Sequence, residues 1–439
     1  MCCQRLAVCQ LPLLAAASAG LMIQIDGFDN IFLNYARYGA RSMTINKSPI
    51  ESNIEWRKAN AAQIADGLQS LRAKTLAVFD AYVAADRLSV PYADELNPPL
   101  WELGHVAWFQ EYWIGCNQQR DLGIHYDANH ARLPSVLAQA DSWYNSSMVS
   151  HASRWHLPLL ESAACKDYLA ETLNQTLALL AQAGDSDDAL YFYRLALFHE
   201  AMHLEAAIYM AQVVGVVLDA NFDKEFTPSL IAPQAINTPA KCQFLHQKQT
   251  LYLGSRDTGF AFDNELDAHS VEVDAFVIDS RCVNWSEYLS FVEATARSLP
   301  RYVRRSGSAY EKQEFGVWQP LDLHATAVHL KLADAQDYCV WAGRRLPAEA
   351  EWELAASTRH EVNFKWGEVW EWTSSPFAPY PGFVAHPYLD YSAPWFGSRQ
   401  VLRGACAATH PMMKNVTYRN YFTPDRTDIY AGFRTCNDD

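Results

Sequence analysis

The 439-residue chain has no closely spaced cysteine pair, no long apolar run and little positive charge, and each absence excludes a class of protein. Its ten cysteines are scattered, without a C-x-x-C pair or a regular spacing, which is typical of a reduced, cytoplasmic chain. No stretch reaches the roughly 18 apolar residues of a membrane-spanning helix. The 35 Lys and Arg residues stand against 50 Asp and Glu, a net charge of -15. We therefore expect neither a nucleic acid nor a membrane as a partner.

Internal repeats and low-complexity tracts are also absent, and the composition is that of a globular protein. Half of the residues are hydrophobic and 13% are aromatic, and the length suits two or three domains. At the N-terminus, Arg5 precedes an apolar stretch, 11–20, in a faint signal-peptide pattern, which the single positive charge and the neighbouring cysteines weaken. We expect residues 1–52 to be a poorly ordered extension, or the product of an upstream start codon.

Two kinds of pattern divide the rest of the chain. Between residues 53 and 220, apolar residues recur at helical spacing in four long segments, which predicts a four-helix bundle. Prolines at 228, 233 and 239 mark a linker over 221–248. From 249 to 439, short strand-like pieces alternate with short helices and with turns rich in Gly, Pro and Trp. The sequence therefore predicts an α+β protein of two domains, the second irregular.

The pair His199 and His203 lies four residues apart in a segment that otherwise indicates a buried helix. On a helix this spacing puts both imidazoles on one face, where they can bind one metal ion. With Glu200 the segment also matches the H-E-x-x-H pattern of zinc proteases, but neither a glycine turn nor a third ligand follows it. The other interpretation is a pair of structural core histidines.

A third ligand is expected upstream, at His105. Two prolines open its segment, and three aromatic residues, Trp101, Trp108 and Tyr112, share its helical face. Neutral imidazoles suit zinc, iron, copper or nickel, so the three histidines alone leave the metal open.

Four ordered motifs in the second half resemble the formylglycine-generating-enzyme-like (sulfatase-modifying-factor) domain, which is related to C-type lectins. The motifs are G-R-R-L-P-A-E-A-E-W-E-L-A-A at 343–356, W-G-E-V-W-E-W-T-S-S at 366–375, V-L-R-G at 401–404 and A-G-F-R at 431–434. The oxidase branch of that superfamily uses two cysteines near its C-terminus. Here Cys406 is followed by Pro411 instead, which argues against formylglycine generation.

A histidine-bearing DinB-like bundle followed by this domain resembles the ergothioneine-type sulfoxide synthases, which are non-haem iron(II) oxidoreductases. The resemblance implies Fe(2+) bound by His105, His199 and His203. It implies hercynine, dioxygen and a chalcogen donor as small-molecule substrates. Glu205 matches the terminal acid of the family's H-x-x-x-H-x-E segment, but helical spacing turns it away from the histidines, so we expect it to play a supporting or structural part.

The resemblance also implies residues for the acceptor substrate. Tyr388 would supply a proton or a hydrogen atom to the activated oxygen, and Tyr391 would lie near the trimethylammonium group, since aromatic faces attract such cations. A Y-x-x-Y spacing is weak evidence, and the alternative is two aromatics in a Pro-rich loop. The other residues implied for hercynine are Asn420, Tyr421 and Met202, the last standing where relatives carry a glutamine.

Departures from the family concern the chalcogen donor. Actinobacterial members that use γ-glutamylcysteine resemble this chain at Arg154, but His151 stands where they have an arginine and Phe422 where they have an aspartate. A donor with two carboxylates would therefore lack charged binding partners that it has in those relatives. Segments 97–105, 144–151 and 195–203 are most similar to the selenoneine synthase branch, which takes a selenosugar.

Four functions remain open at this point. The favoured one is selenoneine synthesis, which forms a C–Se bond. The alternatives are sulfoxide synthesis with cysteine or γ-glutamylcysteine, a zinc hydrolase or transferase of the bundle type, and a non-catalytic module that binds a quaternary ammonium. The sequence does not give the oligomeric state.

Overall fold

The computed structural model describes residues 55–218, 241–256, 258–359 and 364–438. From Glu55 onward the chain forms one compact unit. The expected N-terminal extension, 1–52, and most of the expected linker, 221–248, lie outside the described residues.

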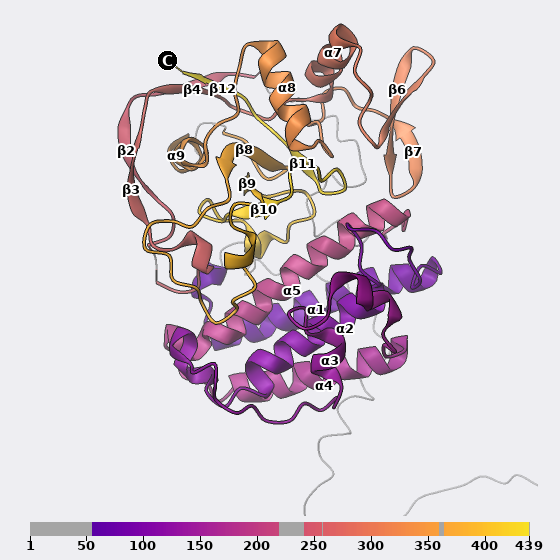
Figure 1. The fold of residues 1–439 in the computed structure, drawn as a ribbon, viewed down its shortest axis with the longest axis vertical. Helices are drawn as coiled ribbons and strands as arrows, with labels where there is room; N and C mark the ends of the chain where they lie inside the picture. The colour runs from indigo at the N-terminus through magenta and orange to yellow at the C-terminus, as the bar shows by residue number, and fades with distance from the viewer. Residues whose placement is uncertain (1–54, 219–240, 257, 360–363, 439) are drawn as a thin grey trace, which may run out of the picture. The chain divides into compact units, whose positions relative to one another are not determined.

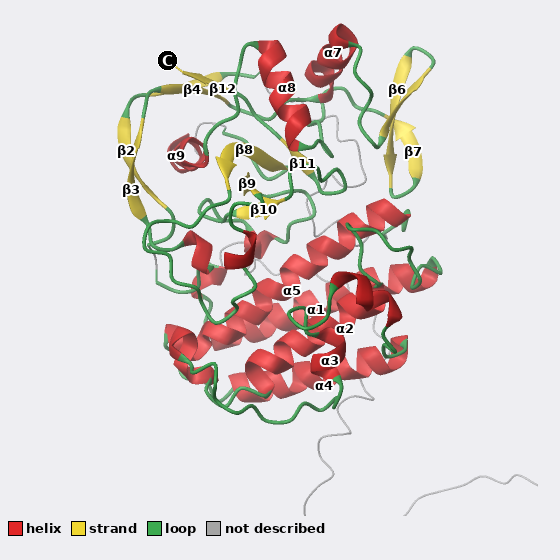
Figure 2. Cartoon of the chain, in the orientation of Figure 1, coloured by secondary structure: helices red, strands yellow, loops and turns green. Residues whose placement is uncertain are grey.

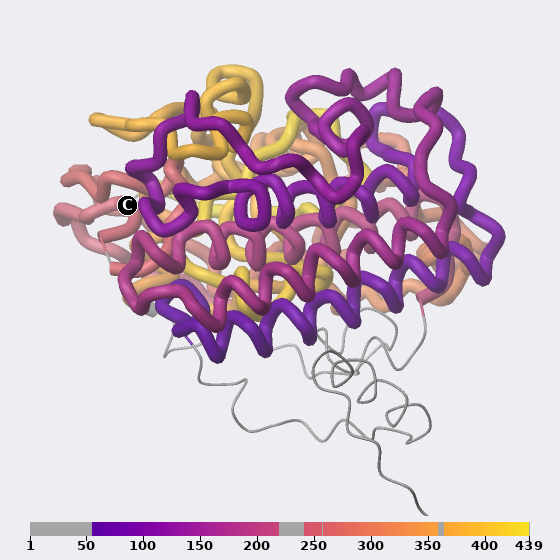
Figure 3. The backbone as a smooth tube through the Cα atoms, turned by 90° about the horizontal axis from the view of Figure 1, so that it is seen from below, coloured from indigo at the N-terminus to yellow at the C-terminus, as the bar shows by residue number. Residues whose placement is uncertain are grey.

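The first part of this unit is the predicted bundle (Figure 1). Its long helices are α1 Ala61–Ala84, α2 Pro99–Gln110, α4 Ser162–Leu180 and α5 Asp187–Val214. Helix α1 packs on α5 and α2 on α4, and Figure 3 shows these segments running side by side. None of the described helices combines the length and the apolar character that a membrane crossing requires.

Local sequence signals fix the ends of these helices. Asn60 accepts a hydrogen bond from the backbone of Gln63 and closes a capping box at the start of α1. Proline at the first position opens α2. Gly215, with φ of 72°, ends α5 in the left-handed conformation that glycine adopts without strain.

The long connection between α2 and α4 contains short helical turns rather than an extended loop. Helix α2 first continues into a π-helical turn, Glu111–Gly115. The later turns are η4 Arg120–His125, α3 Ala140–Tyr144 and η5 His151–His156. Ser147 in this connection donates a hydrogen bond to Asp390, so the connection touches the C-terminal half of the chain.

The second part is a set of small sheets with short helices (Figure 2). The sheet orders are β1-β4-β12, β10-β9-β8-β11, β2-β3 and β5-β6-β7. The strands are β1 Gln243–His246, β2 Gln249–Leu253, β3 His269–Val273, β4 Phe276–Asp279, β5 Val303–Ser306, β6 Ala309–Glu314, β7 Val317–Pro320, β8 Trp370–Pro376, β9 Gln400–Gly404, β10 Asn420–Phe422, β11 Ala431–Gly432 and β12 Cys436–Asp438. The helices are α7 Trp285–Thr295, α8 Leu332–Ala342 and α9 Glu349–Arg359.

The α+β architecture of two parts matches the prediction from the sequence, but the domain boundary needs a correction. Strand β1 lies inside the predicted linker 221–248 and pairs antiparallel with β4. Because its backbone hydrogen bonds belong to the sheet, the C-terminal domain begins before residue 249.

The four sequence motifs of this domain meet in buried ion pairs. Glu353 of the first motif pairs with Arg403 of the third, and Glu371 of the second pairs with Arg434 of the fourth. All four side chains are at most 3% exposed. A buried charge is tolerated only beside a partner, so each motif needs another one, which explains their joint occurrence in the sequence.

Glu205 joins the two halves. Its carboxylate accepts hydrogen bonds from Trp370 Nε1 and Thr409 Oγ1, each at 2.6 Å. Burial raises the pKa of Glu205. This acid of the H-x-x-x-H-x-E segment therefore attaches α5 to strand β8 and plays a structural part.

Candidate metal centre

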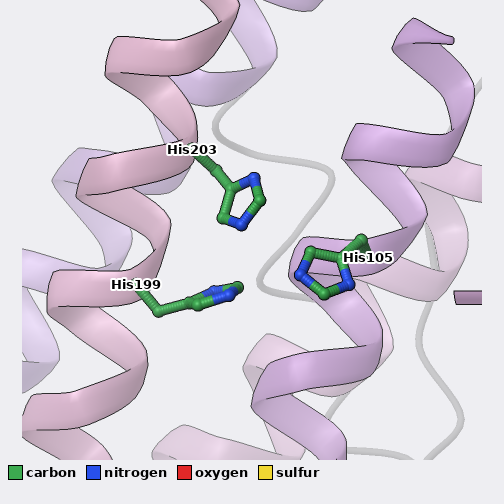
Figure 4. A group of neighbouring side chains, drawn as sticks. All are labelled: His105, His199 and His203. Atoms are coloured by element: carbon green, nitrogen blue, oxygen red, sulfur yellow. The ribbon is translucent and has the colours of Figure 1, made fainter. Parts of the chain in front are cut away.

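Three histidines converge between α2 and α5, as the sequence predicts (Figure 4). His105 comes from α2, and His199 and His203 lie one turn apart on α5. One ring nitrogen of each lies within 4.8 Å of those of the other two. The site is therefore formed by residues of two helices.

Neighbouring groups fix which nitrogen faces the centre. His105 Nδ1 lies 2.7 Å from the backbone carbonyl of Tyr144, and His203 Nδ1 lies 2.6 Å from Glu102 Oε2. Both oxygens can only accept, so each Nδ1 carries the hydrogen and each Nε2 keeps its lone pair. His199 Nε2 is buried with no hydrogen-bond partner among the described residues. Three such nitrogens fit a divalent metal ion.

Burial keeps two of the three ligands, His105 and His199, neutral. His105 and His199 are 2% and 1% exposed. Burial, with His203 close by, lowers the pKa of His105 to about 3 and holds that of His199 well below its usual value. Aromatic rings also pack on these imidazoles. The ring centroids of Phe109 and His199 lie 3.4 Å apart, and those of Trp101 and His105 lie 4.8 Å apart.

Glu200 faces away from this centre, which removes it as the general base that the zinc-protease pattern requires. Arg72 donates two hydrogen bonds to its carboxylate, at 2.8 and 3.0 Å, and Thr75 donates a third at 2.9 Å. The residue after a helical ligand points about 100° around the helix, here toward α1. The H-E-x-x-H pattern is therefore coincidental.

Glu102 is part of the site, although the sequence analysis assigned it no function. It lies one helical turn before His105 and is 7% exposed. Burial by itself would raise its pKa, but the charge and hydrogen bond of His203 bring that pKa down to about 2. Its i−3 spacing from a ligand could have identified it.

Tyr388 lies beside the histidine centre, and Tyr391 lies next to Tyr388. The ring of Tyr388 lies 5.9 Å from that of His199 and 5.0 Å from that of Phe109. Burial raises the pKa of Tyr388, so its hydroxyl is protonated at neutral pH. The ring of Tyr391 lies 5.9 Å from that of Tyr388, centroid to centroid, and stacks on the ring of Phe262 at 4.3 Å.

The other residues predicted for the acceptor substrate lie around Tyr391 to different degrees. Tyr421 donates to the Tyr391 carbonyl and stacks on Phe377. Met202 reaches the same cluster through Tyr418, whose hydroxyl lies 3.6 Å from its sulfur and 3.3 Å from the Tyr391 hydroxyl. Tyr418 was not predicted, and no spacing signal marks it.

Asn420 occupies a different position. Its side-chain oxygen accepts from the backbone of Tyr421. Strand alternation places it on the face of β10 opposite Tyr421.

Of the residues predicted for the chalcogen donor, His151 and Arg154 share the turn η5, and Phe422 lies in β10. Arg154 lies with its guanidinium 3.8 Å over the Trp101 ring. His151 donates from Nε2 to the backbone carbonyl of Leu96 at 2.7 Å. Phe422 packs 5.1 Å from the guanidinium of Arg426. No contact between side chains in the described ranges joins these three predicted residues directly.

Comparisons with known proteins agree with this architecture. Residues 237–369 and 365–439 match the family model of the sulfatase-modifying factor enzyme 1-like domain. A hercynine oxygenase of Mycobacterium tuberculosis is 27% identical over 85% of this chain and 98% of its own length. Ergothioneine biosynthesis protein 1 of Schizosaccharomyces pombe is 21% identical over 83% of this chain and 55% of its own. A formylglycine-generating enzyme of Streptomyces coelicolor is 25% identical, but over only 41% of this chain.

The bundle with its three histidines, joined to a sulfatase-modifying-factor domain, defines an enzyme of the oxidoreductase class. The matched domain, together with relatives that align over most of the chain, supports membership of the ergothioneine-type sulfoxide synthase family.

Proposed function

We propose that this protein binds iron(II) through His105, His199 and His203 and joins a chalcogen to the imidazole carbon of hercynine with dioxygen as the oxidant. The observation that carries the proposal is the convergence of three imidazoles, with the Tyr388 ring 5.9 Å from that of His199. Relatives named for hercynine and for ergothioneine support the acceptor.

The reaction balances with one dioxygen. The imidazole C–H bond and the chalcogen–H bond break, and a carbon–chalcogen bond forms. One oxygen atom leaves as water, and the other remains on the chalcogen. Iron bound by three imidazoles would supply open coordination positions and one-electron chemistry. Holding both substrates beside one another lowers the entropic cost of the coupling.

The protein side chains position the acceptor and handle the proton. Tyr388, protonated at neutral pH, can donate its hydroxyl hydrogen on the side of the centre where His199 lies. Tyr391, Tyr421 and Phe262 offer aromatic faces to a trimethylammonium group. Met202 is proposed to contact the acceptor from α5. Asn420 is proposed to do so from β10, which requires its side chain to leave the face opposite Tyr421 and its bond to the Tyr421 backbone.

For the donor, we favour a selenosugar and hence selenoneine synthesis, with cysteine or γ-glutamylcysteine and C–S bond formation as the alternative. Binding through Arg154, His151 and Phe422 is the proposed arrangement. His151 is engaged with Leu96, and Arg426 beside Phe422 is paired with Asp428 at 2.5 and 2.6 Å. Of these groups, only Arg154 offers an uncommitted donor, since its Nε is buried without a partner in the described structure. One such cation suits a donor with at most one anionic group.

Mass spectrometry of the products tests the proposal. Iron(II)-loaded protein is given hercynine and dioxygen, with a selenosugar, cysteine and γ-glutamylcysteine competing in one reaction. We expect a selenium adduct. A sulfoxide adduct would instead establish the alternative donor, and the absence of any hercynine adduct would refute the proposed chemistry.

Two other functions receive less support. A zinc hydrolase would need Glu200 as a base, and that carboxylate is held by Arg72. A binding module for a quaternary ammonium would not need three converging imidazoles. Metal analysis after anaerobic purification separates these cases, because stoichiometric zinc and oxygen-independent activity would contradict the iron proposal. A cytoplasmic location is proposed from the cysteine pattern.

A further inference from the structure

A chain of hydrogen bonds runs from Arg154 to the candidate ligand His203. Arg154 Nη1 donates to Asn97 Oδ1 at 2.8 Å, and Asn97 Nδ2 donates to Glu102 Oε1 at 2.5 Å. The other oxygen of Glu102 lies 2.6 Å from His203 Nδ1. Four side chains from three segments are thereby connected end to end.

The direction of every bond in this chain follows from its first member. A guanidinium can only donate, so Arg154 fixes the oxygen of the Asn97 amide toward itself and the nitrogen toward Glu102. Glu102 must then accept on that side. As an ionised carboxylate it also accepts on the other side, so His203 must carry its hydrogen on Nδ1. The lone pair of Nε2 is left for a metal.

The location of Glu102 supports its charge. It lies in the first turn of α2, which begins with Pro99, and the positive end of a helix dipole stabilises a carboxylate there. The Trp101 ring packs against the Arg154 guanidinium at 3.8 Å and holds it in place. The chain is therefore built from buried or half-buried groups with little freedom to rearrange.

We propose that Glu102 is the positioning residue for His203, and that Asn97 and Arg154 orient Glu102, so that this hydrogen-bond chain sets the tautomer and the donor strength of one metal ligand. The inference rests on the proposed metal site and adds a group that does not itself touch the ion. Carboxylates behind metal-bound histidines commonly contribute 10- to 100-fold to metal affinity. A second consequence is that Arg154, at the proposed donor side, is connected to the ligand His203 through only two side chains, Asn97 and Glu102.

The test uses cobalt(II) as a spectroscopic probe in the full-length protein, with affinity measured by chelator competition. We expect Glu102→Gln to lower cobalt(II) affinity about 10- to 100-fold and to shift the visible absorption bands. A glutamine at 102 has one acceptor oxygen instead of two and carries no charge. It therefore cannot accept hydrogen bonds from both Asn97 and His203 as the carboxylate does. Glu205→Gln is the matched control: it is also a buried carboxylate on the bundle with two hydrogen bonds, but it contacts none of the three histidines.

A second variant keeps the inference testable if Glu102→Gln folds poorly. Asn97→Leu keeps the same branched arrangement of heavy atoms and removes the hydrogen bonds that link Arg154 to Glu102. We therefore expect about a 3- to 10-fold loss of cobalt(II) affinity, below the range for Glu102 itself. Wild-type affinity and spectrum in Glu102→Gln would overturn the positioning role. Wild-type behaviour in Asn97→Leu alone would overturn the outer half of the chain.

The same titration distinguishes a failure of the proposed function. If wild-type protein binds no cobalt(II), or binds it without imidazole ligation, the metal site itself is refuted and the inference falls with it. If wild-type protein binds cobalt(II) tightly and Glu102→Gln does so equally, only the inference fails.

Discussion

The two halves of the protein contribute to one site in different ways. The bundle supplies all three candidate metal ligands from two regular helices. The C-terminal domain supplies Tyr388 and Tyr391 from a segment outside the strands and helices, with Tyr421 added from the short strand β10. Helical periodicity thus positions the candidate metal ligands, and long-range packing positions the residues proposed for the substrate.

The two halves are also stabilised by different kinds of contact. Around the histidines, aromatic rings stack on the imidazoles, and one buried pair, Arg72 with Glu200, holds α5 against α1. In the C-terminal domain, buried arginine–glutamate pairs connect distant motifs. Changes in the bundle should therefore affect metal binding first, and changes in the C-terminal domain should affect substrate handling or folding.

Loss of a bundle histidine should have the largest effect. We expect His105→Ala to abolish stoichiometric metal binding and to reduce product formation at least ~1,000-fold, since two imidazoles hold such an ion poorly. His329→Asn is the control in the C-terminal domain, because this buried histidine has a φ of 63° that asparagine tolerates. Metal content after anaerobic reconstitution checks both variants. Full metal occupancy in His105→Ala would remove His105 from the ligand set.

Tyr388→Phe should separate metal binding from the coupling reaction. Because only a hydroxyl is lost, we expect unchanged iron content and a fall in coupling of about 100-fold or more, the scale of a lost proton donor. Tyr144→Phe is a suitable control, since the backbone carbonyl that holds His105 is kept. Single-turnover product analysis makes the measurement. Equal product yields from wild type and Tyr388→Phe would rule the residue out.

The buried pairs give a third comparison, in stability. Glu200→Gln and Glu353→Gln each leave a buried arginine without its charged partner, and we expect each to lose about 3–5 kcal/mol of unfolding free energy. Glu200→Gln should nevertheless keep its metal and its product in the folded fraction. Urea denaturation measures the first effect and product yield per folded protein the second. Selective loss of activity in Glu200→Gln would restore the general-base interpretation.

The same contrast explains what the sequence predicts and what it does not. The spacing of His199 and His203, and the prolines before His105, are local signals, and the structure confirms that they define helices and a convergent centre. Tyr418 comes from an irregular segment and is defined only by packing across the domain. Its role could not be predicted, because no periodicity records a contact between residues more than 200 positions apart.

The remaining site residues were predicted from the resemblance alone, and their roles stay predictions. Tyr388 and Tyr421 lie beside Tyr391. His151 and Phe422 are held by separate neighbours. A donor pocket depends on the surfaces of two packed domains, and a single substitution can redirect it without leaving a pattern in the sequence.

The pH dependence of stability should show the smallest effect. It tests whether burial lowers the pKa of a histidine in the C-terminal domain as it does in the bundle. Burial lowers the pKa of His105 and of His329 to about 3, against about 6.5 in an unfolded chain. Between these values the unfolded chain binds more protons, so stability is fully present above pH ~6.5 and falls as the pH drops toward 3. Each such group contributes at most ~1.4 kcal/mol per pH unit. His329→Asn should therefore make the decline of metal-free protein between pH 6.5 and 5.5 shallower by about 1 kcal/mol, measured by urea denaturation. An identical slope in wild type and variant would mean that His329 is protonated in the folded protein and is not buried as the structure shows.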